Sequence, residues 1–148
     1  MKVSLVIPVY NEGPHLEEFF GHLVQTPFDF AYELVVVDDC STDGSWDLIQ
    51  KIAQRIPITV HRHERNQGKG AAVRKGIELA TGDVITVQDA DFEYDPNDLN
   101  ALTQPIFAGK ADVVYGSRFR KTSPQVHRTF HYLINRLLTL ISNVMSGL

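Results

Sequence analysis

The sequence has almost no cysteine and no long apolar run. Its 148 residues include a single cysteine, Cys40, so the chain cannot form an intramolecular disulfide or a cage of cysteine ligands around a metal. No apolar stretch reaches the roughly 20 residues that a membrane-spanning helix needs. The N-terminal residues enter a strand-like segment directly, without the layout of a signal peptide. These absences favour a cytoplasmic protein.

Acidic residues are missing from the C-terminal quarter of the chain. Residues 1–112 hold all 18 Asp and Glu and nine of the 14 Lys and Arg, whereas residues 113–148 hold five basic residues and no acidic one. Such an asymmetry indicates an anionic partner for the tail. Phosphate groups, an anionic membrane surface and the acidic body of the same protein are the candidates, and no nucleic acid is expected among the partners.

The tail also has a helical pattern of apolar residues. The members of this stripe are Phe130, Leu133, Ile134, Leu137, Leu138, Ile141, Val144 and Met145. A helix that is apolar on one broad face and basic beside it can lie on a membrane surface, and it can equally pack against another part of the protein. The pattern predicts a basic amphipathic segment over residues 120–148, and a peripheral position at the cytoplasmic face of the membrane stays open.

Five apolar runs rich in β-branched residues predict strands, in a chain whose length suits one domain. The runs are Lys2–Val9, Glu33–Asp38, Ile58–His63, Val84–Val87 and Asp112–Gly116, and the fourth is expected to be buried. Helical spacing predicts two inward-facing stripes: Leu16, Phe19, Phe20 and Leu23 in the first helix, and Val73, Ile77 and Ala80 in the third. Strands that alternate with helices indicate βαβ units, a parallel sheet and an α/β fold.

Three of the predicted strands end in polar and acidic residues. Pro8-Val-Tyr-Asn-Glu12 ends the first, Asp38-Asp39 the second and Asp89-Ala-Asp91 the fourth. The carboxyl ends of parallel strands meet at one edge of the sheet, where ligands bind, so we expect these groups to converge. Two carboxylates separated by one residue repel each other unless a cation lies between them. The last pair therefore predicts a divalent metal site, with a solvated acidic turn as the alternative.

The glycines before the third helix complete no known phosphate-binding fingerprint. Gly68-Lys-Gly70 lacks the Gly-Lys-Ser/Thr ending of a phosphate loop, and Val73 stands where a dinucleotide fingerprint has its third glycine. The amides at the start of the helix still favour an anion. On their own, the glycines favour a tight turn over a phosphate site.

Five motifs, taken together in their order and spacing, resemble a known family. They are Val6-Ile-Pro-Val-Tyr-Asn-Glu12, Val35-Val-Val-Asp-Asp-Cys-Ser-Thr-Asp-Gly44, Asn66-Gln-Gly-Lys-Gly-Ala-Ala-Val-Arg-Lys-Gly76, Asp89-Ala-Asp91 and Gly116-Ser-Arg-Phe119. The set resembles the family 2 glycosyltransferases of GT-A fold, in the branch with dolichyl- and polyprenyl-phosphate mannosyl- or glucosyltransferases. The resemblance implies a Rossmann-like nucleotide-diphospho-sugar transferase fold, with a mostly parallel sheet flanked by helices. Residues 1–119 would form the nucleotide-sugar-binding core.

The resemblance also implies roles for matching residues. Those expected to bind the nucleotide-sugar are Pro8, Tyr10, Glu12, Asp39, Lys69, Asp89 and Ala90. Among them, Asp39 would read the base. The structural alternative is that Pro8 ends a strand and Tyr10 packs against its neighbours.

Asp89 and Asp91 match the Asp-X-Asp motif of the family, which holds the ribose and a Mg²⁺ or Mn²⁺ that bridges the diphosphate. The candidate catalytic residues are Asp91 and Arg118. The guanidinium of Arg118 would meet the diphosphate or the acceptor phosphate, because its planar fork suits phosphate oxygens; pairing with a nearby carboxylate is the alternative.

The implied reaction is a metal-dependent, inverting transfer of a hexose of mannose or glucose type. The donor would be of GDP-mannose or UDP-glucose type, and the acceptor a polyprenyl or dolichyl phosphate. Glu93 stands where mannosyltransferase members carry Gln, so the identity of the sugar stays open. Relatives continue past a helix like that of residues 120–148, so the chain resembles a C-terminally truncated transferase that includes the start of an acceptor or membrane-proximal region.

Two other functions compete with glycosyl transfer. One is a nucleotide-binding module without turnover, because acceptor elements are missing. The other is a nucleotidyltransferase, which shares a similar sheet and metal carboxylates. The glycine-rich loop with Arg and Lys that such enzymes carry directly after the first strand is absent here, which lowers this alternative.

Overall fold

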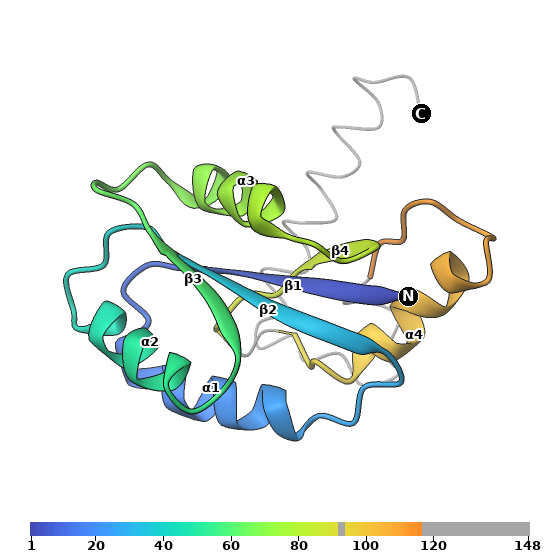
Figure 1. Cartoon of the computed structure of the whole chain (residues 1–148), viewed down its shortest axis with the longest axis horizontal. Coiled ribbons are helices and arrows are strands. Elements are labelled where there is room, and N and C mark those ends of the chain that lie inside the picture. Colours follow the sequence, from blue (N-terminus) through green and yellow to red (C-terminus); the bar gives the residue numbers. More distant parts are fainter. Residues whose placement is uncertain (92–93, 117–148) are drawn as a thin grey trace, which may run out of the picture. The chain divides into compact units, whose positions relative to one another are not determined.

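The computed structural model describes residues 1–91 and 94–116 (Figure 1). Contacts divide the chain into two units, Met1–Val114 and Tyr115–Leu148, and the elements below belong to the first. They are β1 Lys2–Val9, α1 Gly13–Gln25, β2 Ala31–Asp38, α2 Ser45–Ala53, β3 Ile58–Arg62, α3 Lys69–Leu79, β4 Val84–Val87 and α4 Asp98–Phe107. Within this described part, no helix has the length and apolar character to cross a membrane. The segment 120–148 and Arg118 lie outside the described residues.

The four strands form one parallel sheet in the order β3-β2-β1-β4. In its register, Val9 pairs with Asp38 and Asp38 with Arg62. Strands β1, β2 and β3 therefore end together at one edge, the C-terminal edge of the sheet. The parallel sheet and the α/β class that the sequence predicts are confirmed.

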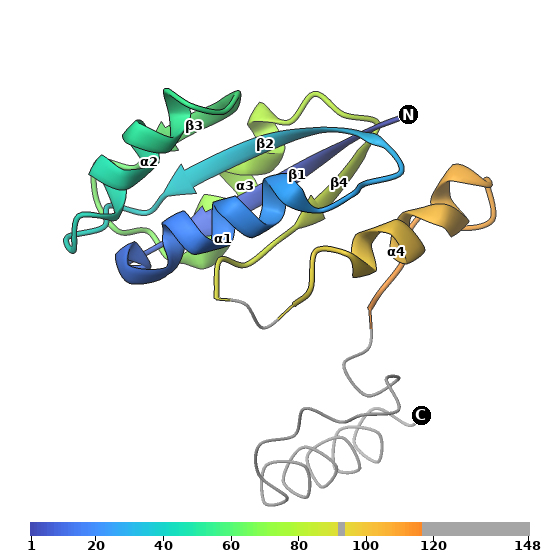
Figure 2. The ribbon, with the colours of Figure 1, turned by 90° about the horizontal axis from the view of Figure 1, so that it is seen from below.

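Helices α1 and α2 cover one face of the sheet, and α3 lies on the other (Figures 1 and 2). Toward α1 and α2, alternate side chains of the two central strands build the core: Val3, Leu5, Ile7, Val9, Leu34 and Val36. From α1 the predicted stripe of Leu16, Phe19, Phe20 and Leu23 is buried against them. Each large apolar side chain buried in this way contributes about 2 kcal/mol, so this face supplies most of the hydrophobic stabilisation.

Helix α3 packs on the opposite face through its small residues, contrary to the predicted stripe. Its buried residues are Ala72 and Gly76, whereas Ile77 is 46% exposed. A Cβ atom at Gly76 would overlap Cγ1 of Val6 on β1. The absence of a side chain lets the helix approach the strand closely, and a pattern read from large apolar residues misses such a contact.

The strand predicted over Val84–Val87 is present as β4, but its expected burial was wrong, and so was the strand predicted over residues 112–116. Ile85 and Val87 of β4 are 41% and 43% exposed, because β4 lies at an edge of the described sheet and α3 covers β1 and β2. Residues 112–116 are not a strand: no described strand pairs with them, and Val113 and Tyr115 are largely exposed. Alternation of apolar residues cannot distinguish a buried strand from one whose covering layer lies elsewhere.

Glu33 ties the N-terminal edge of the sheet together. Its Oε1 accepts hydrogen bonds from Ser4 Oγ at 2.5 Å and from the Thr81 amide at 2.6 Å, and Lys2 Nζ lies 2.6 Å from Oε2. Burial raises the pKa of Glu33, but these bonds outweigh it and lower the pKa to about 2. The carboxylate joins β1, β2 and the turn before β4, and it does so at the edge far from the strand ends that carry the motifs.

Candidate active site

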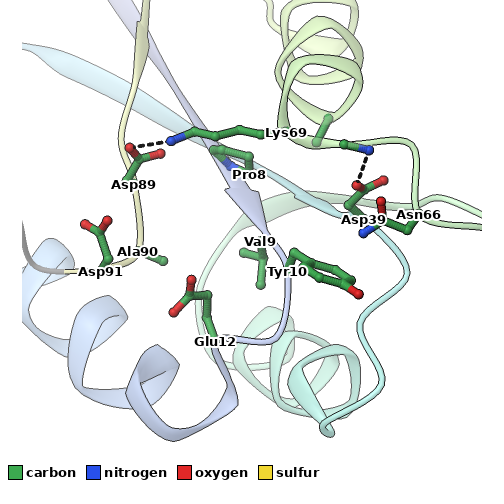
Figure 3. A pocket seen from close by; sticks show the side chains of 12 residues that line it. Pro8, Val9, Tyr10, Glu12, Asp39, Asn66, Lys69, Asp89, Ala90 and Asp91 are labelled. Carbon is green, nitrogen blue, oxygen red and sulfur yellow. Dashed lines mark hydrogen bonds and ion pairs between the residues drawn. The ribbon is translucent and has the colours of Figure 1, made fainter.

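A cavity of about 200 Å³ opens at the C-terminal edge of the sheet (Figure 3). Its lining consists of Pro8, Val9, Tyr10, Glu12, Asp39, Asn66, Gly68, Lys69, Ala72, Asp89, Ala90 and Asp91. Every site residue expected from the sequence is in this lining except Arg118, which lies outside the described residues. Val9, Asn66, Gly68 and Ala72 were not expected individually, although the last three belong to the glycine-rich motif before and within α3.

The segment after β1 is held in place by the segment after β2. Asn11 has a left-handed backbone (φ 57°), and its Oδ1 accepts a hydrogen bond from the Thr42 amide at 2.9 Å. The Glu12 amide donates to Ser45 Oγ at 3.0 Å. These bonds fix the turn that presents Tyr10 and Glu12 to the cavity. Tyr10 is 48% exposed, so its ring is available to a ligand.

The adjacent carboxylates Asp38 and Asp39 point to opposite faces and do different work. Asp38 shares the face of Val9 in the register, is fully buried, and pairs with Arg62 Nε at 3.1 Å. Arg62 also stacks over Trp46, 5.4 Å from the ring centroid. Asp38 is therefore part of the framework, and only Asp39 lines the cavity.

Asp39 is held by three donors. Its Oδ1 lies 2.7 Å from His63 Nδ1 and accepts from the Gln67 amide at 2.9 Å, and its Oδ2 accepts from the Gly68 amide at 2.7 Å. Burial raises the pKa of Asp39, but these hydrogen bonds outweigh it and lower the pKa below its usual value. The ionised carboxylate thus ties β2 to the end of β3 and to the loop that enters α3.

Lys69, the first residue of α3, reaches across the cavity to Asp89. Its Nζ lies 2.7 Å from Asp89 Oδ2, and the hydrogen bond to this carboxylate raises the pKa of Lys69. The loop that carries Asp89 is supported from within by Gln88, which is buried and donates to the carbonyl oxygen of Asp89 at 3.2 Å. A basic side chain and the N-terminus of a helix therefore face the acidic strand end.

Negative charge gathers on one side of the cavity, where Glu12, Asp89 and Asp91 lie together (Figure 3). Burial raises the pKa of Glu12, and repulsion from Asp91 raises it further. Asp39 and Asn66 lie on the other side of the cavity (Figure 3). The site thus has an acidic end with one lysine and a second end with a buried carboxylate and an amide.

The acidic end suits a divalent cation that shares its coordination with a ligand. In residues 1–91 and 94–116, no group of three or more His, Cys, Asp or Glu side chains is placed to hold a metal by itself. Mg²⁺, however, is usually bound by one or two carboxylates together with phosphate oxygens and water. Asp89 and Asp91 provide such carboxylate oxygens, so the donor set fits Mg²⁺ or Mn²⁺ in the presence of a diphosphate.

Comparison with known proteins gives concordant results. The family model described as glycosyl transferase family 2 matches residues 4–145. A dolichol-phosphate mannosyltransferase of Pyrococcus furiosus is 40% identical over 121 residues, which cover 82% of this chain and 34% of that protein. The chain therefore spans about a third of the length of this relative.

Solved structures agree with the observed fold. The mannosyltransferase PcManGT from Pyrobaculum calidifontis, in complex with GDP-Man and Mn²⁺, matches with a TM-score of 0.58 and 30% identity over 65% of this chain and 29% of that one. TarS 1-349 of S. aureus in complex with UDP matches with a TM-score of 0.65 and 27% identity over 85% of this chain and 41% of that one. The expected GT-A fold is confirmed for the part that the chain covers.

Proposed function

The chain belongs to glycosyl transferase family 2, and we propose that it transfers a hexose from a nucleotide-diphosphate sugar to a polyprenyl or dolichyl phosphate. One observation carries this proposal: three strand ends and the start of α3 converge on one cavity, which has an acidic end and a second end with the buried carboxylate of Asp39 and the amide of Asn66. The first relative, named a dolichol-phosphate mannosyltransferase, supports the acceptor class. The solved relatives include a GDP-Man and a UDP complex and leave the base open.

The nucleoside would occupy the end of the cavity beside Asp39. The exposed ring of Tyr10 offers a surface for stacking against a flat base. Asp39 is an ionised acceptor that can pair with an N–H group of the base. Pro8 and Ala90 would complete the pocket walls.

The diphosphate would occupy the acidic end. Asp89 and Asp91 would hold Mg²⁺ or Mn²⁺, and such an ion, when bound, neutralises negative charge on the diphosphate as a Lewis acid. Lys69 would move its ammonium from Asp89 to a phosphate oxygen, and the amides at the start of α3 favour the same anion. Arg118 remains a proposed second cation for the diphosphate or the acceptor phosphate.

The acceptor phosphate would attack the anomeric carbon directly. One of its oxygens forms the new bond to this carbon while the bond from the carbon to the diphosphate oxygen breaks, which inverts the configuration. A phosphate is already ionised near neutral pH, so the site has to position it rather than remove a proton from it. The basic residues of segment 120–148 would favour such an acceptor, at the cytoplasmic face of a membrane.

A transfer assay tests the proposal. The purified chain would be incubated with Mn²⁺ and radiolabelled nucleotide sugars, and offered either a short polyprenyl phosphate or water-soluble alcohols. We expect label in the polyprenyl-phosphate product. Transfer to the alcohols alone would contradict the acceptor. Nucleotide binding with neither transfer nor donor hydrolysis would favour the binding module, and formation of nucleotide sugar from a sugar phosphate and a nucleoside triphosphate would favour a nucleotidyltransferase.

A further inference from the structure

We infer that the donor nucleotide carries uracil or thymine rather than guanine, because the contacts of the described residues leave Asp39 a single hydrogen-bonding position for a base. The inference rests on the proposed function, in which Asp39 reads the base. It goes further in that it selects one nucleotide class and assigns the selection to a residue outside the cavity lining, His63.

The protein itself occupies most of the acceptor capacity of Asp39. A carboxylate has about four lone-pair directions, two on each oxygen. Oδ1 lies 2.7 Å from His63 Nδ1 and 2.9 Å from the Gln67 amide nitrogen, and Oδ2 lies 2.7 Å from the Gly68 amide nitrogen. Both positions on Oδ1 are therefore taken, and one position on Oδ2 is left.

The side chain of Asp39 cannot rotate to present other hydrogen-bonding positions to a base. Asp39 is 2% and His63 8% exposed, so both side chains are enclosed. Their backbones are also fixed, since the Asp39 amide donates to the Val9 carbonyl at 2.8 Å and the His63 amide to the Asp38 carbonyl at 2.9 Å. A rotation of the carboxylate would break its three hydrogen bonds in a buried place, where unpaired polar groups are costly.

The bases differ in what they offer to a carboxylate. Guanine presents two adjacent donors, N1–H and the N2 amino group, which pair with the two oxygens of one carboxylate. Uracil and thymine each present one donor, N3–H, between two carbonyl groups. Cytosine and adenine place a ring-nitrogen acceptor beside their amino group, and a carboxylate repels that acceptor. With Oδ1 filled, only uracil and thymine pair their donor without leaving another donor or acceptor facing Asp39. Asn66, beside Asp39 in Figure 3, has an amide that suits a uracil carbonyl.

His63 is the positioning residue in this arrangement. Its ring nitrogen fills one position on Oδ1, and the ring is too buried to contact the nucleotide itself. Removal of the imidazole would open this position, so that guanine could use both oxygens. His61, two residues earlier on β3, has its ring centroid 5.4 Å from that of His63. It is not among the described residues that donate a hydrogen bond to Asp39, so it provides a matched control.

Calorimetric titration of the whole chain with UDP and with GDP, each with Mn²⁺, tests the inference. We expect UDP to bind about tenfold or more tightly than GDP, since guanine leaves a donor unpaired. His63→Leu should narrow this ratio severalfold, His63→Gln should restore part of it through its amide, and His61→Leu should leave it unchanged. The ratio of two affinities measured on one variant is independent of a general loss of stability, which circular dichroism would monitor.

The outcomes separate the inference from the function on which it rests. Equal or tighter binding of GDP by the unmodified chain would overturn the inference and leave the proposed function intact. An unchanged ratio in His63→Leu would overturn the role of His63 in the selection. Failure of both nucleotides to bind would overturn the proposed function, and the inference with it.

Discussion

Glu33 at one edge of the sheet and Glu12 at the other have pKa shifts of opposite sign. At the N-terminal edge, Glu33 is enclosed by donors from Lys2, Ser4 and Thr81, and its pKa falls to about 2. At the C-terminal edge, burial and the negative charge of Asp91 raise the pKa of Glu12. Glu33 thus holds strands together at the N-terminal edge, whereas Glu12 lies beside other carboxylates at the C-terminal edge. Glu12, Asp89 and Asp91 lie close together at this edge, and such a cluster of carboxylates favours a cation or a ligand that carries one.

The largest effect is expected from Asp91→Asn at the C-terminal edge. Because the substitution removes a carboxylate from the proposed metal site, Mn²⁺-dependent nucleotide affinity should fall about a hundredfold, while the free energy of unfolding changes little. Calorimetry and a denaturant melt would measure the two quantities. Asp112→Asn, at an exposed position outside the cavity, is the control. Unchanged affinity of Asp91→Asn for nucleotide with Mn²⁺ would refute the metal assignment.

The N-terminal edge should show the converse, a dependence of stability on acid. The pKa of Glu33 is about 2 in the folded state, against 4.5 for an unperturbed glutamate. Its contribution, on the order of 2–3 kcal/mol, is therefore complete above pH 4.5 and is lost as the pH falls toward 2. Urea melts between pH 7 and pH 2.5 would follow this loss. In Glu33→Gln the stability should be lower at pH 7 and the acid-dependent decline smaller, with nucleotide affinity unchanged. An equally steep decline in the variant would assign the acid sensitivity to other carboxylates.

A smaller effect is expected from Lys69→Met. The substitution removes a cation from the acidic end, so the affinity for the nucleoside diphosphate should fall about tenfold. Lys75→Met is a matched control on the same helix, since Lys75 pairs with Glu78 at 3.2 Å on the surface. Equal losses in the two variants would show that Lys69 acts only through the overall charge of α3.

The smallest effect is expected from Glu12→Gln. Since burial, and after it repulsion from Asp91, raises the pKa of Glu12, its negative charge destabilises the folded chain relative to the unfolded one. Neutralisation should therefore raise the free energy of unfolding of the unliganded chain by about 0.5 kcal/mol. Glu33→Gln, in contrast, should lower the free energy of unfolding. A thermal melt at pH 7 without metal would detect it. Destabilisation by Glu12→Gln would remove the contrast between the two edges.

The strands at the centre of the sheet and the helix that covers them could be predicted from the sequence. Burial on both faces makes β1 and β2 continuously apolar, and the stripe of α1 is wide and regular. The face of α3 could not be predicted, because its contact with β1 depends on Gly76, which adds nothing to an apolar pattern. Likewise β4 was expected to be buried, because its composition does not show whether another layer covers it.

The candidate site could be predicted from the sequence because its residues follow parallel strands, which must end at the same edge of the sheet. The family resemblance singled out Asp39, but the apolar pattern gives no reason to prefer it over Asp38, since only the register shows which of two adjacent carboxylates faces the core. It also did not indicate the partnership of His63 with Asp39, or that of Glu33 with Lys2 and Thr81. These pairs are distant along the chain and have no motif, so only the folded structure brings them together.

The close contact at Gly76 links the distance between α3 and the sheet to the width of the cavity. Helix α3 starts at the cavity with Lys69 and lies against β1 at Gly76, where a Cβ atom would strike Val6. A side chain at this position would push α3 away from β1, and the helix would tilt. Because Lys69 lies two turns from Gly76 on the same helix, a small displacement of the helix at Gly76 would increase the distance between Lys69 and Asp89. The absence of a side chain at Gly76 thus helps to set the distance between Lys69 and Asp89, where the diphosphate of the proposed ligand would bind.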